Sequence, residues 1–240
     1  MSKLVYQPRT DFFIEVGLIN LQSVLNEATF EVEVNAQTIK KIQEHLKNSL
    51  DTNIICFPEY TYSDELYDLF RNFSNQNKII IIGGSGIENN GNISYAYCPI
   101  FIPNKDLIKV YKKYPTVEEK AFSKGRLIAF PDATERHFLI EFNNYEFVFS
   151  VYICYDFLQE KYSKRSDIVI IQQYEKSPRH FINSSTSIIQ GFDNFVLGVN
   201  NSDGQTLRSL GFGNLNSTLI NAFSKLKKRK KDTSVQNKFS

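Results

Sequence analysis

Hydrophobic positions along the chain follow two different periods in turn. Short continuous apolar runs, typical of buried strands, lie at 12–20, 54–57 and 78–82. Between them, apolar residues recur at helical spacing over 39–50 and 66–73, with charged residues on the other faces. This alternation predicts a sheet with helices packed outside it.

The rest of the chain is richer in strands than in helices. The pattern predicts strands at 95–102, 107–111, 137–142, 145–154, 167–171 and 195–199. Asn143-Asn144 separates two of them and is typical of a hairpin turn. A helix is expected at 181–195, although Gly191 weakens that prediction. Together the segments predict a mixed α/β fold.

Composition narrows the class of protein. The chain of 240 residues is 42% apolar and carries a formal charge of +2, which fits an ordinary globular domain. We expect this domain at 1–222, followed by a basic, disordered tail at 223–240 that contains the run 225–231. The three cysteines form no CxxC pair, and no signal peptide or membrane span is visible. A cytoplasmic location is therefore expected.

Cys154 is the first candidate for chemistry. It closes the apolar run of a predicted strand and is followed at once by Tyr155 and Asp156. Ends of strands are common places for catalytic groups in α/β proteins. A cysteine is also among the residues most often buried as a small hydrophobe, so Cys154 alone does not decide between catalysis and packing.

Two further residues follow strands in the same way. Glu59 comes after a short buried strand that Pro58 interrupts, and Lys113 comes after the strand at 107–111. Taken singly, each could be a solvated loop residue. A carboxylate, an ammonium and a thiol at three strand ends would, however, supply a base, an oxyanion partner and a nucleophile.

The neighbours of these residues resemble the motifs of the nitrilase superfamily, the carbon–nitrogen hydrolases. The matching segments are Phe57-Pro58-Glu59, Tyr111-x-Lys113 and Cys154-Tyr155-Asp156. Secondary similarities lie at Gly83-Gly84, at 94–96 and at 193–213, so that the resemblance covers about 12–220. The resemblance implies a four-layer α-β-β-α sandwich.

The resemblance also implies roles for individual residues. Cys154 would attack a carbonyl carbon, Glu59 would act as general base, and Lys113 would stabilise the oxyanion. The backbone N–H of Tyr155 would be a second oxyanion donor. A second site glutamate is expected at Glu119, with Glu118 as the alternative. The residues expected to line the pocket are Tyr60, Tyr155, Gln172, Gln173 and Tyr174.

The function implied is hydrolysis of a small amide or N-carbamoyl amine through a cysteine thioester. No cofactor or metal is expected, the partner is a small amide-type substrate, and a homodimer is implied by the resemblance. Two features depart from the pattern: the segment 190–194, and a chain that ends soon after the resemblance does. They leave open a degenerate ligand-sensing module. An acyltransferase using the same thioester and nucleic-acid binding by the run 225–231 are further alternatives.

Overall fold

The structure is a computed structural model, and it describes the chain in ten segments. These are 2–5, 14–26, 28–142, 145–160, 166–174, 181, 183–185, 195–200, 210–213 and 235–238. The predicted turn at Asn143-Asn144, most of the predicted helix at 181–195, the segment 190–194 and the basic run 225–231 lie outside the described residues.

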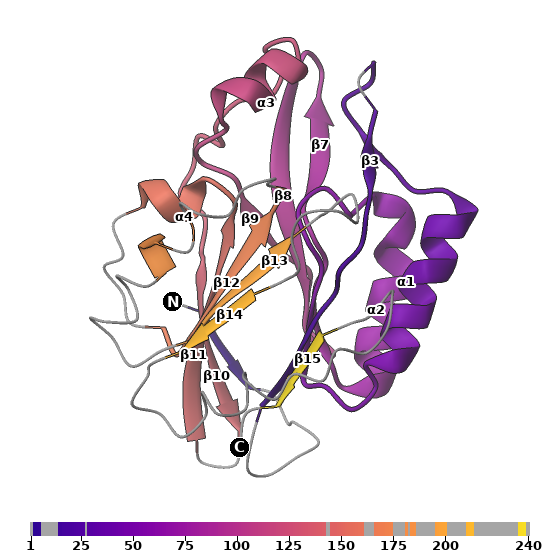
Figure 1. Ribbon diagram of the computed structural model, residues 1–240, viewed down its shortest axis with the longest axis vertical. Coiled ribbons are helices and arrows are strands. Elements are labelled where there is room, and N and C mark those ends of the chain that lie inside the picture. The colour runs from indigo at the N-terminus through magenta and orange to yellow at the C-terminus, as the bar shows by residue number, and fades with distance from the viewer. Residues whose placement is uncertain are drawn as a thin grey trace.

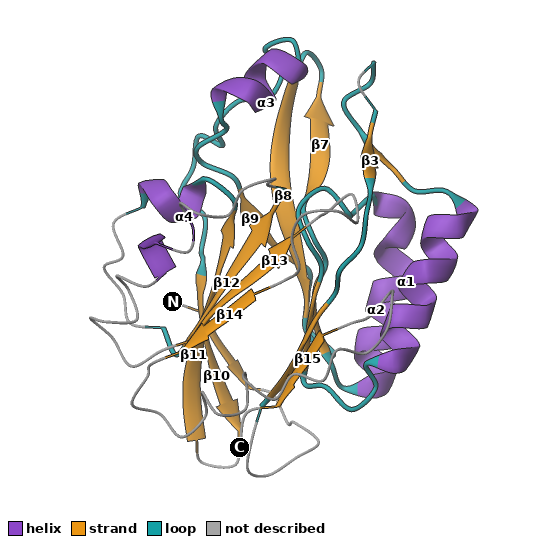
Figure 2. Cartoon of the chain, in the orientation of Figure 1, coloured by secondary structure: helices purple, strands orange, loops and turns teal. Residues whose placement is uncertain are grey.

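Two twisted sheets face each other, and helices cover one of them (Figures 1 and 2). The first sheet has the strand order β1-β10-β11-β12-β13-β14. Its strands are β1 (Ser2–Val5), β10 (His137–Phe142), β11 (Tyr145–Ile153), β12 (Ile168–Gln173), β13 (Phe195–Asn200) and β14 (Leu210–Gly213). In this sheet β11, β12 and β13 run parallel, so their carboxyl ends meet at one edge.

The second sheet has the order β15-β2-β5-β6-β8-β7, with β9 also paired to β8. Its strands are β2 (Glu15–Leu18), β5 (Ile54–Cys56), β6 (Ile80–Ile82), β7 (Gly86–Asn90), β8 (Ile93–Phe101), β9 (Ile108–Tyr111) and β15 (Val235–Lys238). A short ribbon of β3 (Val24–Leu25) and β4 (Val32–Glu33) stands apart.

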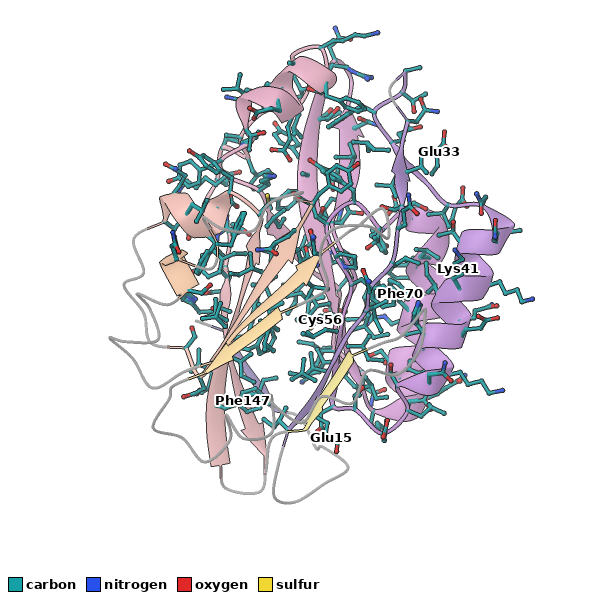
Figure 3. All side chains as sticks on the ribbon, in the orientation of Figure 1. Glu15, Glu33, Lys41, Cys56, Phe70 and Phe147 are labelled. Carbon is teal, nitrogen blue, oxygen red and sulfur yellow. The ribbon has the colours of Figure 1, made fainter. Side chains whose placement is uncertain are left out.

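Helices α1 (Ala36–Asn48) and α2 (Tyr67–Asn77) pack on the outer face of the second sheet (Figure 1). The side chain of Asn35 caps α1 by accepting a hydrogen bond from the Thr38 N–H. Phe70 of α2 points into the sheet whereas Lys41 of α1 points to solvent (Figure 3). The short elements are η1 (Asp64–Leu66), α3 (Val117–Phe122) and α4 (Asp156–Gln159).

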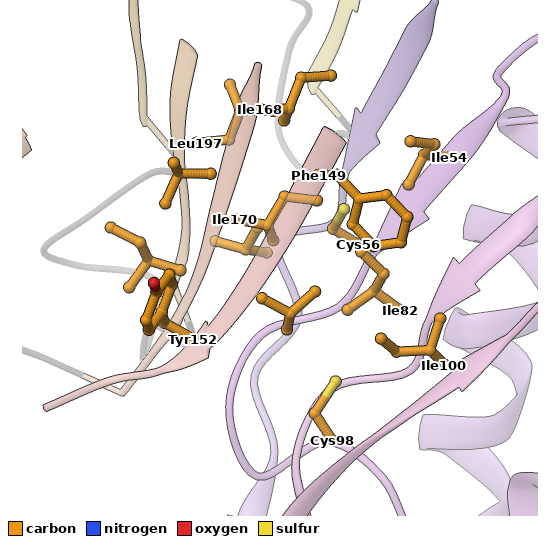
Figure 4. Packing of buried hydrophobic residues seen from close by; sticks show 14 of the residues in the cluster. Ile54, Cys56, Ile82, Cys98, Ile100, Phe149, Tyr152, Ile168, Ile170 and Leu197 are labelled. Atoms are coloured by element: carbon orange, nitrogen blue, oxygen red, sulfur yellow. The ribbon is translucent and has the colours of Figure 1, made fainter. Parts of the chain in front are cut away.

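The main core fills the space between the two sheets. Alternate residues of the central strands enter it: Ile54 and Cys56 of β5 face Phe149 of β11 and Ile170 of β12 (Figure 4). The residues between them, such as Ile55, face α1 and α2 and join a second cluster. The central strands β5 and β6 are thus apolar on both faces, which explains their continuous hydrophobic runs.

The architecture confirms the prediction of a mixed α/β fold, with differences in individual strands. The predicted strand at 12–20 shortens to β2, and six further strands were not predicted, namely β1, β3, β4, β7, β14 and β15. The structure corrects the prediction of a disordered tail at 235–238, because β15 pairs antiparallel with β2 there. In the described part of the chain, no helix is long and apolar enough to cross a membrane.

Candidate active site

Glu59 is buried at the end of β5. Phe57 continues the strand and stacks on Phe70, with 4.9 Å between the ring centroids. Pro58 has no N–H to continue the sheet. The Glu59 side chain that follows is only 1% exposed. Glu59 is therefore not a solvated loop glutamate.

Gly84 allows a second loop to pack closely on this one. A Cβ added to Gly84, which has φ +79°, would lie 2.6 Å from the Pro58 carbonyl oxygen and closer still to Thr61. The Gly83-Gly84 turn seen in the sequence therefore presses against the loop that carries Glu59.

Gly84→Ala should consequently destabilise the protein more than Gly91→Ala. Gly91 also has a positive φ of +61°, but a Cβ there would meet nothing within 4 Å. Gly91→Ala should cost about 1–2 kcal/mol of backbone strain. Gly84→Ala should cost a further ~1–3 kcal/mol from overpacking. Urea unfolding of both variants measures the difference, and equal losses would contradict the close packing.

Lys112 lies directly beyond β9 and is 1% exposed. Val110 faces the core between the sheets, and Tyr111 packs on the outer cluster. Because successive strand residues alternate, Lys112 returns to the inner side. Its Nζ donates to Glu59 Oε1 at 2.8 Å and also to Glu119 Oε1. These three residues, Glu59, Lys112 and Glu119, form what we call the charged cluster.

The structure therefore corrects the predicted lysine. Lys113 is exposed and lies outside the charged cluster. The physical reason is strand alternation, which sends the side chain after Lys112 back toward solvent. The sequence did contain the information, because residues two positions apart in a strand face the same side and Val110 and Lys112 are such a pair. The Tyr-x-Lys pattern instead favoured Lys113.

Glu119 reaches the cluster from α3, and Glu118 is exposed. The orientation of Glu119 is fixed by a capping box. Its Oε2 accepts the Thr116 N–H at 2.7 Å, while its own N–H donates to the Thr116 hydroxyl. The remaining oxygen, Oε1, accepts from Lys112 and from the Tyr60 hydroxyl. Of the two expected glutamates, Glu119 is the one that the fold places beside Lys112.

Cys154 lies at the tight turn from β11 into α4. Its φ is +47°, a conformation that costs a residue with a side chain about 1–3 kcal/mol. Its N–H donates to the Gln172 carbonyl oxygen at 2.7 Å, which extends the β11–β12 pairing by one residue. The thiol is 8% exposed and contacts the Glu59 carboxylate and the backbone N–H of Tyr174.

Burial and neighbouring charges shift the pKa values of Glu59, Lys112 and Cys154. Burial raises the pKa of Glu59 to about 7, although Lys112 opposes this shift. Burial acts to lower the pKa of Lys112, but Glu59 and Glu119 outweigh it and hold the pKa well above its usual range. Burial and then Glu59 raise the pKa of the Cys154 thiol, which therefore rests protonated. A thiol with a neighbouring base of pKa near 7 is suited to proton transfer.

The residues predicted to line the pocket differ in their contacts and in their exposure to solvent. Tyr60 has φ +56°, and its ring meets Tyr174 edge-on at 5.9 Å. The Gln172 side chain crosses between the sheets and donates to the Phe57 carbonyl oxygen at 3.0 Å. Tyr155 is half-exposed and precedes α4, and Tyr174 is exposed.

The structure corrects the prediction for Gln173. Successive side chains of β12 point to opposite faces, so Gln173 faces away from the cluster that Gln172 approaches. Its Oε1 lies 3.1 Å from where a Cβ on Gly198 would be. Gln173 therefore packs over β13 and does not join the site.

Comparison with solved structures places this arrangement among known folds. A carbon–nitrogen hydrolase superfamily protein of Xanthomonas campestris, XC1258, aligns with a TM-score of 0.64 and 14% identity, over 96% of this chain and 91% of that one. The carbon–nitrogen hydrolase of Helicobacter pylori aligns with a TM-score of 0.58 and 14% identity, over 94% and 88% of the two chains. The fold is that of the nitrilase superfamily.

A third neighbour with the nitrilase fold is an amidase of Nesterenkonia AN1. It aligns with a TM-score of 0.58 and 10% identity, over 88% of this chain and 87% of that one. No family model matches the sequence, and no curated protein matches it. The likeness therefore lies in the arrangement of the nitrilase fold and not in extended sequence identity.

Proposed function

We propose that this protein hydrolyses a carbon–nitrogen bond of a small non-peptide amide or N-carbamoyl amine. The proposal rests on the position of Lys112, whose Nζ donates hydrogen bonds to both Glu59 and Glu119 beside the Cys154 thiol. The solved neighbours support it, since one is an amidase and another carries an arsenic adduct in its active site. A variant of the Nesterenkonia amidase has also been seen with the acetamide moiety of fluoroacetamide added covalently at its active-site cysteine.

The first half of the reaction would form a thioester. Glu59 accepts the thiol proton as Cys154 Sγ bonds to the carbonyl carbon, and the carbonyl electron pair moves to oxygen. Lys112 and the N–H of Tyr155 are the proposed donors to that oxyanion. When the C–N bond breaks, Glu59 returns its proton to the departing amine.

The second half would release the acid. Glu59, again a carboxylate, takes a proton from water as the water oxygen attacks the thioester carbon. The C–S bond then breaks, and the proton on Glu59 returns to the thiolate. Glu119 touches Lys112 throughout and would hold it in place, which makes Glu119 a positioning residue in this scheme.

Ammonia release from a panel of small primary amides and N-carbamoyl amines tests the proposal. Mass spectrometry of Cys154 in the same reactions separates the alternatives. An acyl adduct with ammonia release supports hydrolysis, whereas tight binding of a compound without adduct or turnover favours a ligand-sensing module. An adduct that is discharged only by added amines favours acyl transfer.

The activity should depend on pH through Glu59. Because the pKa of Glu59 is raised to about 7 and its deprotonated form is the base, kcat/KM should fall as the pH is lowered through about 7. It should drop about tenfold for each further pH unit. A pH profile from about two units below this pKa to about two units above it measures the fall. A rate that stays flat across the acidic half of that range would exclude Glu59 as the base.

A further inference from the structure

Arg136 and Asp156 form a buried ion pair beside the strand end that carries Lys112. Arg136 Nη2 lies 2.6 Å from Asp156 Oδ2, and both side chains are almost completely buried. Arg136 lies just before β10, whereas Asp156 is the first residue of α4, two positions after Cys154. A buried pair of this kind gains little net stability over apolar residues, so stability alone does not explain its presence.

Both members of the pair form hydrogen bonds to the backbone on either side of Lys112. Arg136 Nη2 donates to the carbonyl oxygen of Tyr111 at 3.0 Å. On the other side, Asp156 accepts the N–H of Lys113 at 3.0 Å and the N–H of Tyr114 at 2.7 Å. The peptide groups before and after Lys112 are thus fixed by one ion pair.

The same pair links these peptide groups to the nucleophile. Asp156 is connected to Cys154 by the tight turn into α4, where the Phe157 N–H donates to the Cys154 carbonyl oxygen at 3.1 Å. A movement of Asp156 would therefore displace two segments at once: the backbone beside Lys112 and the turn that carries the Cys154 thiol. The chain offers two adjacent lysines, and the pair fixes the strand end in the register that turns Lys112 inward.

We infer that the Arg136–Asp156 ion pair is a positioning clamp, which selects Lys112 over Lys113 and holds its ammonium against Glu59 and the Cys154 thiol. The clamp touches no reacting atom in the proposed reaction. It is connected both to the backbone beside Lys112 and to the turn at Cys154, and the first connection is the one through which it acts. It rests on the proposed role of Lys112, but its effect on the thiol can be measured without any substrate.

The test is alkylation of Cys154 by iodoacetamide, followed by mass spectrometry as a function of pH. Cys56 and Cys98 are fully buried in the core, so the folded protein should react at Cys154. Lys112 lowers the pKa of the thiol against the effects of burial and of Glu59. Lys112→Met should therefore slow alkylation about tenfold at a pH of about 8, the change that accompanies one pKa unit.

Asp156→Asn distinguishes a positioning role of Asp156 from a direct effect of its charge on the thiol, because the two change the alkylation rate of Cys154 in opposite directions. Removal of a nearby negative charge would by itself favour the thiolate and speed alkylation. If the clamp holds Lys112, its loss should instead slow alkylation, as Lys112→Met does. In the double variant Lys112→Met/Asp156→Asn the two effects should not add, because both act through one ammonium.

Glu160→Gln is the matched control. Glu160 accepts from Arg136 Nε at 2.9 Å, whereas the bonds of Arg136 to Tyr111 and Asp156 are both made by Nη2, so alkylation of Cys154 in Glu160→Gln should be as fast as in the unmodified protein. If Asp156→Asn does not fold, Arg136→Lys is used instead. A lysine ammonium cannot reproduce the planar geometry with which the guanidinium binds both the Tyr111 carbonyl oxygen and Asp156. Unchanged or faster alkylation in the folded clamp variant, or additive slowing in the double variant, would overturn the inference.

Discussion

Cys154→Ala is expected to abolish ammonia release and covalent adduct formation while the protein stays folded. Loss of the nucleophile of a catalytic unit can lower kcat by on the order of 10⁶-fold, which would put turnover below detection. The side chain is small and lies at the edge of the core, so the free energy of unfolding should change by only about 1 kcal/mol. Turnover assays, adduct mass spectrometry and urea unfolding together measure these effects.

Cys98→Ala is the control for this substitution. Cys98 is a buried thiol of β8 in the same core and is not a member of the charged cluster (Figure 4). Its replacement should leave turnover unchanged and lower stability through the cavity it creates. Turnover in Cys154→Ala at the level of the unmodified protein would remove the thioester from the mechanism.

Lys112→Met is expected to lower kcat by about 10²–10³-fold, the usual loss when one oxyanion donor is removed. It should also reduce the free energy of unfolding by about 3–5 kcal/mol, because Glu59 and Glu119 lose the cation between them. Kinetics at saturating substrate and urea unfolding measure the two effects separately.

Lys113→Met applies the same change one residue later and serves as the control. Its side chain is exposed, and its backbone N–H, which Asp156 binds, is retained. Activity and stability should therefore stay close to those of the unmodified protein. A larger loss of kcat in Lys113→Met than in Lys112→Met would restore the lysine that the sequence motif favoured.

The sequence predicted most of the strand ends that carry the site. Glu59 and Cys154 follow apolar runs that are unambiguous as buried strands, and both side chains lie where those strands end. The choice between Lys112 and Lys113 failed because it depends on which face of β9 points inward, and a short motif does not encode that face. Strand parity, counted from Val110, would have given the observed residue.

The contacts around Asp156 could not have been read from the sequence. Its partners Arg136, Lys113 and Tyr114 lie 20 to 43 positions away and meet it only because β9, β10 and α4 converge. Gln172 is a similar case, since its bond to Phe57 spans 115 positions. Side chains whose role is to join distant segments leave no local pattern, so they become visible only in the folded chain.

The two-sheet arrangement divides the candidate site between two halves of the chain. The charged cluster comes from 14–130, which builds the second sheet except for β15, and the proposed nucleophile comes from the sheet built mainly by 137–213. An exposed stretch at 131–133 joins them. Neither half holds a complete set of groups, so the thiol meets its base only after the apolar faces of both halves have closed on each other. Chemical competence is thus coupled to the docking of the two halves, and a chain in which they have not docked would hold the thiol apart from Glu59.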